Sequence, residues 1–187
     1  MLKKITMFLA FAALTTSAIA DNEALGNDSR NTSALIGLEM GSMNIDAQTA
    51  VFEESYSKNI FDVGIRLGAK SEDYRFLGIY HILDSFDHAG NKVENILATA
   101  HLDYMFWRWD LGSSINLKPF IGANGGYIEN KYSAVKEDGF TYGAETGLIL
   151  DMRLFDVDLG VRYMGSNVDA VNELFNVYIG INVKIQP

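Results

Sequence analysis

The stretch that decides the fold is Phe175-Asn176-Val177-Tyr178-Ile179-Gly180-Ile181-Asn182-Val183-Lys184-Ile185. Its odd-numbered positions are all apolar, whereas its even-numbered positions carry two asparagines, a tyrosine, a glycine and a lysine. Successive side chains of a β-strand point to opposite faces, so an apolar residue at every second position predicts a strand with two unlike faces. The stretch therefore predicts a strand that separates an apolar environment from a polar one.

Seven earlier segments alternate in the same way, so the whole chain predicts eight strands. These segments span residues 34–41, 61–70, 74–83, 96–106, 117–127, 140–152 and 157–163. Long polar connections are expected at 43–58, 84–94, 129–138 and 165–173, and shorter ones at 71–73, 107–114 and 153–156. Because long and short connections alternate along the chain, the pattern predicts an antiparallel barrel with long loops at one rim and tight turns at the other.

The composition of the two faces predicts which one lies inside. The apolar face carries no charge, whereas the polar face carries ten glycines and a balanced set of charges. An unpaired buried charge is costly, so a closed interior must balance its charges, while a water-facing surface need not. The sequence therefore favours an all-β, eight-stranded antiparallel up-and-down transmembrane β-barrel, with a soluble periplasmic β-barrel for a small hydrophobic ligand as the alternative. The six acids of the polar face are Glu39, Asp62, Asp103, Glu145, Asp151 and Asp158, and its six bases are Arg66, Lys70, Arg75, Lys118, Arg162 and Lys184.

The first twenty residues have the composition of a secretory signal peptide. Lys3 and Lys4 precede an apolar run, and Ala18-Ile19-Ala20 forms a small-residue cleavage site. We expect a signal peptide over 1–20 cleaved after Ala20, a flexible lead-in over 21–31 and a barrel domain over 32–187. The chain has 187 residues, no cysteine and a formal net charge of −9. The acidity argues against nucleic acid as a partner, and the lack of cysteine excludes disulfides and thiolate metal sites.

Three motifs resemble the small eight-stranded outer-membrane barrels of Gram-negative bacteria, the group of the OmpA transmembrane domain and OmpX/Ail. They are the proline-aromatic-glycine strand 117–127, the arginine-tyrosine strand 158–163 and the final strand 178–185, which lacks the terminal phenylalanine of that group. The resemblance implies a cell outer-membrane location, with outer-membrane lipid, lipopolysaccharide and the barrel-assembly machinery as partners. It also makes a structural or surface-interaction (adhesin-like) role plausible, and we expect no enzymatic activity and no cofactor.

The polar face supplies the candidate site. Glu39, Arg66, Glu145 and Arg162 are expected to form a central ion-pair network with a structural role. Three more residues could extend it: Asp62, Asp103 and Lys118. Eight strands enclose a lumen just wide enough for side chains, so these charges are expected to form a plug, with a narrow porin-like channel as the alternative. The sequence predicts no catalytic residue and no metal ligand.

A second alternative is a lipid A-modifying outer-membrane enzyme. His81, Asp84, Ser85 and His88 cluster at the predicted outer rim and would suit acyl transfer. None of the three histidines begins the histidine-x-serine element of the lipid A deacylase family, because none has a serine two positions later. His101 is interpreted instead as an interior group hydrogen-bonded near Asp103.

The loops are the remaining surface that could carry function, because loops on a rigid scaffold commonly bind ligands. The longest, 43–58, offers Val51, Phe52 and Tyr56 as possible contact residues. Since the polar strand face sums to zero, the acidity is expected at the lead-in and the two rims. There it would face lipopolysaccharide phosphates and require bridging cations.

Overall fold

The computed structural model describes residues 32–48, 55–88, 91–112, 114–132, 135–168 and 171–185. The signal peptide and lead-in expected over 1–31 lie outside these residues. The strands are β1 (Ser33–Gln48), β2 (Ser55–Lys70), β3 (Tyr74–Leu83), β4 (Phe86–His88), β5 (Asn91–Met105), β6 (Trp109–Gly112), β7 (Ile115–Tyr132), β8 (Val135–Met152), β9 (Phe155–Val168) and β10 (Val171–Ile185). Within the same ranges, no helix has the length and apolar character needed to cross a membrane.

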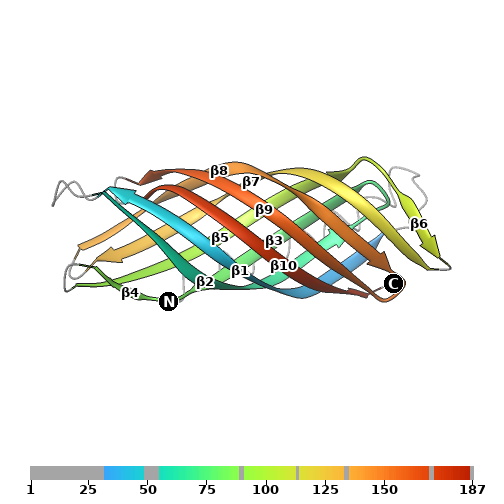
Figure 1. Ribbon diagram of the computed structural model, residues 1–187, viewed down its shortest axis with the longest axis horizontal. Coiled ribbons are helices and arrows are strands. Elements are labelled where there is room, and N and C mark those ends of the chain that lie inside the picture. The colour runs from blue at the N-terminus through green and yellow to red at the C-terminus, as the bar shows by residue number, and fades with distance from the viewer. Residues whose placement is uncertain are drawn as a thin grey trace, which may run out of the picture.

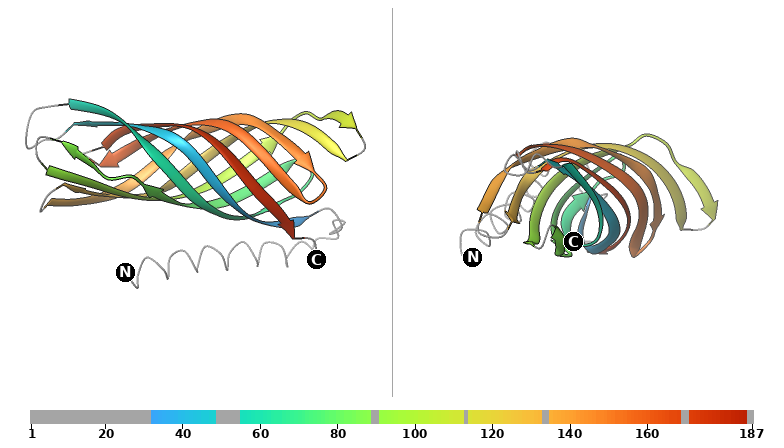
Figure 2. Two further views of the ribbon diagram at one scale, coloured as in Figure 1. Left: turned by 60° about the horizontal axis from the view of Figure 1, so that its bottom comes forward. Right: turned by 60° about the vertical axis from the view of Figure 1, so that its left-hand side comes forward.

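The strands close into a barrel in which every pairing is antiparallel (Figures 1 and 2). Its order runs from β5 through β3, β2, β1, β10, β9 and β8 to β7, and the β5–β7 pairing closes the ring. β4 continues the wall of β3 along β5, and β6 is a short arm that pairs with β7 and projects at one end of the barrel (Figure 1). The wall therefore has eight strands, and the predicted eight-stranded antiparallel barrel is confirmed.

The apolar face points outward and the polar face points into the lumen. On β1, Leu38 is 55% exposed while the adjacent Glu39 is fully buried. The same contrast repeats on β10, where Ile179 and Ile181 are exposed on either side of a buried Gly180. In a protein folded in water this arrangement would be unfavourable, so it indicates a barrel whose outer solvent is apolar.

Aromatic side chains border this apolar belt at both ends. Near the short-turn rim, the ring centres of Tyr74 and Tyr104 lie 5.3 Å apart, and those of Trp107 and Trp109 lie 6.4 Å apart. Near the long-loop rim Phe61, Phe140, Tyr142 and Tyr163 are exposed. Amphipathic rings favour the two interfaces between hydrocarbon and water, so this arrangement suits a membrane-spanning belt.

The strands extend farther at the long-loop end than the sequence predicts. Residues 43–48 and 55–58 belong to β1 and β2, and 129–132 and 135–138 belong to β7 and β8, although all of these were expected in loops. The alternation inverts in these outer parts. On β1, Ser42 and Asp46 point outward and are exposed, while Met43 and Ile45 point inward and are fully buried. A change in which face is apolar was therefore misinterpreted as the end of a strand.

The inverted part of the barrel contains a core of the kind that soluble proteins have. Ten buried side chains fill the lumen there: Met43, Ile45, Ile60, Leu83, Leu97, Ile128, Met164, Val168, Val171 and Leu174, with Phe86 packed against them. A strand needs about 9–11 residues to cross a bilayer, whereas β1 has 16 and β7 has 18. We therefore define this outer part as the outer zone, which extends beyond the apolar belt, and its buried side chains as the apolar plug.

Three aspartate substitutions on β1 test this division. We expect Ser42→Asp to leave the urea unfolding midpoint in lipid vesicles unchanged, because position 42 faces water. Met43→Asp should lower the free energy of unfolding by about 3 kcal/mol or more, because it buries an unpaired carboxylate in the apolar plug. Leu38→Asp should impair insertion because position 38 faces lipid. Equal effects at 42 and 43 would contradict an outer zone with an inverted pattern.

Candidate functional site

The centre of the lumen is held by Arg66 on β2, which reaches across the barrel. Its Nη1 donates to both carboxylate oxygens of Asp158 on β9, each at 2.8 Å, and its Nε donates to Glu39 Oε2 at 3.0 Å. All three side chains are fully buried. The Arg66–Asp158 pair joins two strands that β1 and β10 separate in the sheet, so it ties together parts of the wall that share no backbone pairing.

Arg162 on β9 forms the second half of this centre. It donates from Nη1 to Glu39 Oε1 and from Nε to Glu145 Oε2, both at 2.9 Å. Tyr178 donates to Glu145 at 3.1 Å, and its ring lies 4.5 Å from the Arg162 guanidinium and 5.1 Å from that of Arg66. Glu39 thus accepts from two guanidinium groups, and each of these also stacks on the same aromatic ring.

Two glycines show why the lumen needs positions without side chains. A Cβ at Gly180 would lie 2.0 Å from Arg66 Nη1, and a Cβ at Gly160 would lie 2.6 Å from the Tyr178 hydroxyl. Both are far inside van der Waals contact. These glycines therefore provide the space that the long charged and aromatic side chains of neighbouring strands occupy.

Asp103 and Arg75 form a further ion pair on the short-turn side of the centre. Arg75 Nε donates to Asp103 Oδ2 at 2.8 Å, and its Nη1 lies 3.3 Å from Asp158 Oδ2. The Arg75 guanidinium also lies 4.9 Å from the Phe120 ring centre. Asp103 therefore joins the central network through Arg75.

Two histidines and a threonine connect Asp62 to Glu145. His81 Nδ1 lies 3.0 Å from both oxygens of Asp62, and its Nε2 lies 3.1 Å from Thr99 Oγ1. His101 Nδ1 lies 2.7 Å from Glu145 Oε1, and its Nε2 lies 2.7 Å from the same Thr99 oxygen. His101 is therefore an interior group as expected, but its partners are Glu145 and Thr99 instead of Asp103.

Asp62, His81, Thr99, His101 and Glu145 thus form a chain of five contacting groups. The number of hydrogens that these groups carry determines how many of the contacts between them are hydrogen bonds. An ionised carboxylate only accepts, so each Nδ1 must then carry a hydrogen. Two neutral imidazoles would present two bare Nε2 atoms to Thr99, whose hydroxyl has one hydrogen to donate. One additional proton, on either an imidazole or a carboxylate of the chain, makes all the contacts hydrogen bonds. In that state one of the two Nε2 atoms carries a hydrogen.

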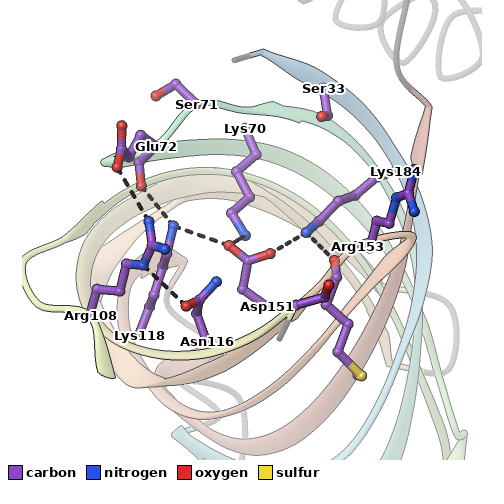
Figure 3. A pocket seen from close by; sticks show the side chains of 12 residues that line it. Ser33, Lys70, Ser71, Glu72, Arg108, Asn116, Lys118, Asp151, Arg153 and Lys184 are labelled. Atoms are coloured by element: carbon purple, nitrogen blue, oxygen red, sulfur yellow. Dashed lines mark hydrogen bonds and ion pairs between the residues drawn. The ribbon is translucent and has the colours of Figure 1, made fainter. Parts of the chain in front are cut away.

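The short-turn mouth of the lumen holds a second charged cluster, shown in Figure 3. Asp151 lies among three lysines: Lys70 Nζ at 3.0 Å, Lys118 Nζ at 3.1 Å and Lys184 in direct contact. Asp156 bonds to Lys70 and Lys184, each at 2.8 Å. Lys118, expected at the edge of the central network, belongs to this cluster, which we call the lysine mouth.

Asp156 is the charged lumen residue that the sequence analysis missed. It was assigned to the short connection 153–156, but it is the second residue of β9, fully buried, and points inward like Asp158. Between the apolar plug and the short-turn rim, the lumen described by the structure therefore holds seven acids and six bases instead of a balanced set. The spacing of two from Asp158 was the available signal, because residues two apart share a face.

The residues proposed for acyl transfer are placed differently from what that reaction needs. His81 is buried in the lumen with both ring nitrogens engaged by Asp62 and Thr99, whereas Asp84 and Ser85 are exposed between β3 and β4. A base that activates a serine needs a free nitrogen within hydrogen-bond reach of it. The side chain of His88 lies outside the described residues.

His81, Asp62 and Glu39 also place one ligand atom each within 4.8 Å of one another, which is close enough for a metal ion. These groups already have partners from the protein, since Asn176 donates to Asp62 at 2.8 Å and two arginines donate to Glu39. A cation here would have to displace those donors and lie beside two guanidinium groups. The arrangement suits internal pairing better than metal binding.

The outer zone carries the rim charges. Lys92 donates to Glu94 at 2.8 Å on its exposed surface, and this hydrogen bond lowers the pKa of the Glu94 carboxyl and raises the pKa of the Lys92 ammonium. Lys136 pairs with Glu129 at 3.0 Å. The suggested contact residues Val51 and Phe52 lie outside the described residues, as does the side chain of Tyr56 within β2.

Solved structures with the same architecture are small outer-membrane barrels. Neisserial surface protein A (NspA) superposes with a TM-score of 0.65 at 19% identity and covers 82% of this chain and 99% of its own. OprH of P. aeruginosa gives 0.53 at 21% identity, covering 82% and 99%, and Ail of Yersinia pestis gives 0.50 at 13%, covering 83% and 99%. No family model and no curated protein matches the sequence. The resemblance to small eight-stranded outer-membrane barrels is confirmed at the level of fold.

Removing the central arginine tests the energetic role of the network. We expect Arg66→Met to lower the free energy of unfolding by about 3–5 kcal/mol, because Glu39 and Asp158 would lose a buried partner. Urea titration in vesicles measures this. Lys92→Met, which removes an exposed partner of Glu94, should leave the midpoint unchanged. An Arg66→Met midpoint equal to that of the wild type would show that the central pairs contribute little.

The additional proton can be detected by nitrogen-15 NMR of the imidazole rings in a His88→Gln variant, which leaves His81 and His101 as the sources of signal. We expect one protonated and one unprotonated Nε2. In Thr99→Val, which lacks the bridging hydroxyl, both Nε2 atoms should be unprotonated, because Nδ1 alone then has an acceptor. Two unprotonated Nε2 signals in the Thr99 protein would contradict the hydrogen count.

Proposed function

We propose that this protein is an outer-membrane barrel with a structural or surface-interaction (adhesin-like) role, a closed lumen and no enzymatic activity. The observation that carries the proposal is the exposure of an aliphatic belt around a buried ionic interior, as in Leu38 and Glu39. A belt of this kind is stable in hydrocarbon, and aromatic side chains border it at both ends. The fold that the chain shares with NspA, OprH and Ail is compatible with an outer-membrane location.

The side chains that fill the lumen favour a closed barrel and argue against a narrow channel. A permeating ion would have to pass the apolar plug, in which Met43, Ile45, Leu97 and Ile128 are fully buried. It would next have to part the pairs that join Glu39, Arg66 and Asp158. An apolar constriction followed by paired charges opposes both wetting and ion passage.

The outer zone supports the surface role. Its outward side chains are polar, and acids such as Asp46, Glu94, Asp138 and Glu173 alternate there with Lys58, Lys92, Lys131 and Lys136. At the acids, contact with lipopolysaccharide phosphates would run through bridging divalent cations. Val51 and Phe52 would extend the contact surface from the adjoining loop, and Tyr56 would extend it from the start of β2. Ail, one barrel of this fold, is an attachment invasion locus protein, and such a role is compatible with rigid strands that extend past the membrane.

The barrel-assembly machinery would insert the chain by recognising β10. That strand keeps an alternating apolar face from Phe175 to Val183 and pairs with β1 to close the wall. Both features suit a final strand that is read during assembly. The pairs Arg66–Asp158, Arg162–Glu39 and Lys70–Asp156 would then form as the wall closes, because they link strands far apart in the sequence.

Cell fractionation and topology tagging test the proposed location. The protein should extract only with detergent, and unboiled and boiled samples should migrate differently on an SDS gel. An epitope inserted between Val51 and Phe52 should be accessible to antibody on intact cells. The same epitope between Arg153 and Leu154, at the opposite rim, should be accessible only after the cells are opened. Recovery in the osmotic-shock fraction would overturn the membrane assignment.

Further readouts on the same material separate the alternative functions. Purified protein in a planar bilayer should show no discrete conductance steps, and steps that grow in Arg162→Ala would establish a channel. Expression should leave the mass of lipid A unchanged. A mass change that is lost in His81→Ala and Ser85→Ala would establish an enzyme and overturn the structural or surface role.

A further inference from the structure

The lysine mouth opens into a cavity of about 500 Å³ at the short-turn rim. Figure 3 shows the side chains that line it, with the Asp151 carboxylate between Lys184 on one side and Lys70 and Lys118 on the other. Lys70 and Lys118 are each only 5% exposed, so their ammonium groups are held inside the barrel. Arg108 and Arg153 lie exposed at the lip of the cavity.

The cavity is positive in a protein that is strongly acidic. Five bases line it, against two acids, Glu72 and Asp151, and Asp156 adds a third acid behind them. The chain as a whole carries a formal net charge of −9. A surplus of cationic groups around a partly enclosed space concentrates anions, because low-dielectric walls focus the field.

Asp151 shows the geometry with which this cluster holds an anion. Its two carboxylate oxygens are shared by three lysine ammonium groups, and two of these also bond to Asp156. Lys118 additionally donates to the backbone carbonyl of Glu72 at 3.2 Å. Asp151 and Asp156 together carry two negative charges against three lysines, so the cluster keeps one positive charge in surplus for an oxyanion that enters from the cavity.

We propose that the lysine mouth binds a phosphate group. Lysine ammonium groups bind phosphate as point charges, and a guanidinium group such as that of Arg153 can donate to it in pairs. The Arg108 guanidinium adds positive charge at the lip, although its Nε already donates to Asp110 and Asn116. The cavity has ample room for a phosphate and the atoms attached to it. The Asp151 carboxylate is an internal competitor for the same lysines. This assignment goes beyond the proposed structural role and does not depend on it.

A second cavity points to phospholipid headgroups as the source of the phosphate. It has a volume of about 190 Å³, and it shares Glu72, Arg108 and Lys118 with the first cavity. Its remaining lining includes Tyr104, Phe106 and Trp107, which are exposed in the short-turn aromatic belt. This cavity connects the lysine mouth with the membrane interface, where lipid phosphates lie. A soluble phosphate compound entering from the water phase is the other source of the same chemistry.

The test uses the full chain folded in dodecyl maltoside, which contains no phosphate. Both tryptophans of the protein, Trp107 and Trp109, lie at this rim and report binding by fluorescence. We expect saturable binding of inorganic pyrophosphate at constant ionic strength. Asp151→Asn should bind about tenfold more tightly because the competitor is neutralised, and Lys118→Gln should bind about tenfold more weakly.

Charge-matched variants at the opposite end of the barrel provide the controls. Asp46→Asn and Lys58→Gln change the net charge by the same amounts and should leave pyrophosphate affinity unchanged. Arg153→Gln changes an exposed lip residue, so we expect the fold to be retained and pyrophosphate binding to be weakened. Unchanged affinity in both Arg153→Gln and Asp151→Asn, or an absence of saturable binding, would overturn the site.

A competition experiment distinguishes the two sources. Dihexanoyl phosphatidylglycerol, added below its micellar concentration, should displace pyrophosphate more effectively than glycerol 3-phosphate does if the site receives lipid headgroups. Equal displacement by both would assign the site to soluble phosphate compounds. Failure of both to displace pyrophosphate would overturn the assignment of a phosphate site.

Discussion

The structure depends on one constraint: charges enclosed in a narrow lumen must be neutralised there. Arg66 meets it by bonding to Glu39 on an adjacent strand and to Asp158 across the barrel. Since three arginines and five acids share the centre, each guanidinium must serve more than one carboxylate. Such a network fixes the barrel diameter, because a wider or narrower wall would leave charged groups unpaired at several kcal/mol each.

The same chain meets two solvents, and this explains why the polarity of its faces inverts. Along β1 the large apolar residues occupy even positions from Ile36 to Met40 and odd positions from Met43. Up to Met40 the outer solvent is hydrocarbon and the lumen is polar. From Met43 onward the outer solvent is water, so the apolar side chains turn inward and form a core. The inward apolar plug thus belongs to the part of the barrel that behaves as a soluble protein.

Alternation predicted the number of strands and the facing of the belt, because both follow from a period of two. It misplaced the outer strand ends, since a search for one continuous apolar face stops where that face changes sides. Alternation also predicted which residue types line the lumen, but it did not predict which of these side chains pair with one another. Asp62 bonds to His81 and Asn176 instead of an arginine, and Lys118 belongs to the mouth. Contacts across a lumen depend on the stagger between strands, which alternation within one strand does not contain.

The charge distribution along the lumen explains how a positive mouth is stable. The centre holds Glu39, Asp62, Asp103, Glu145 and Asp158 against three arginines, so it has two negative charges in excess. With the additional proton that the hydrogen count predicts for the groups from Asp62 to Glu145, that excess falls to one. The lysine mouth holds three lysines against Asp151 and Asp156, a surplus of one positive charge. The two regions therefore neutralise each other along the barrel axis, and the mouth can keep free cationic capacity facing its cavity without leaving a net charge buried in the protein.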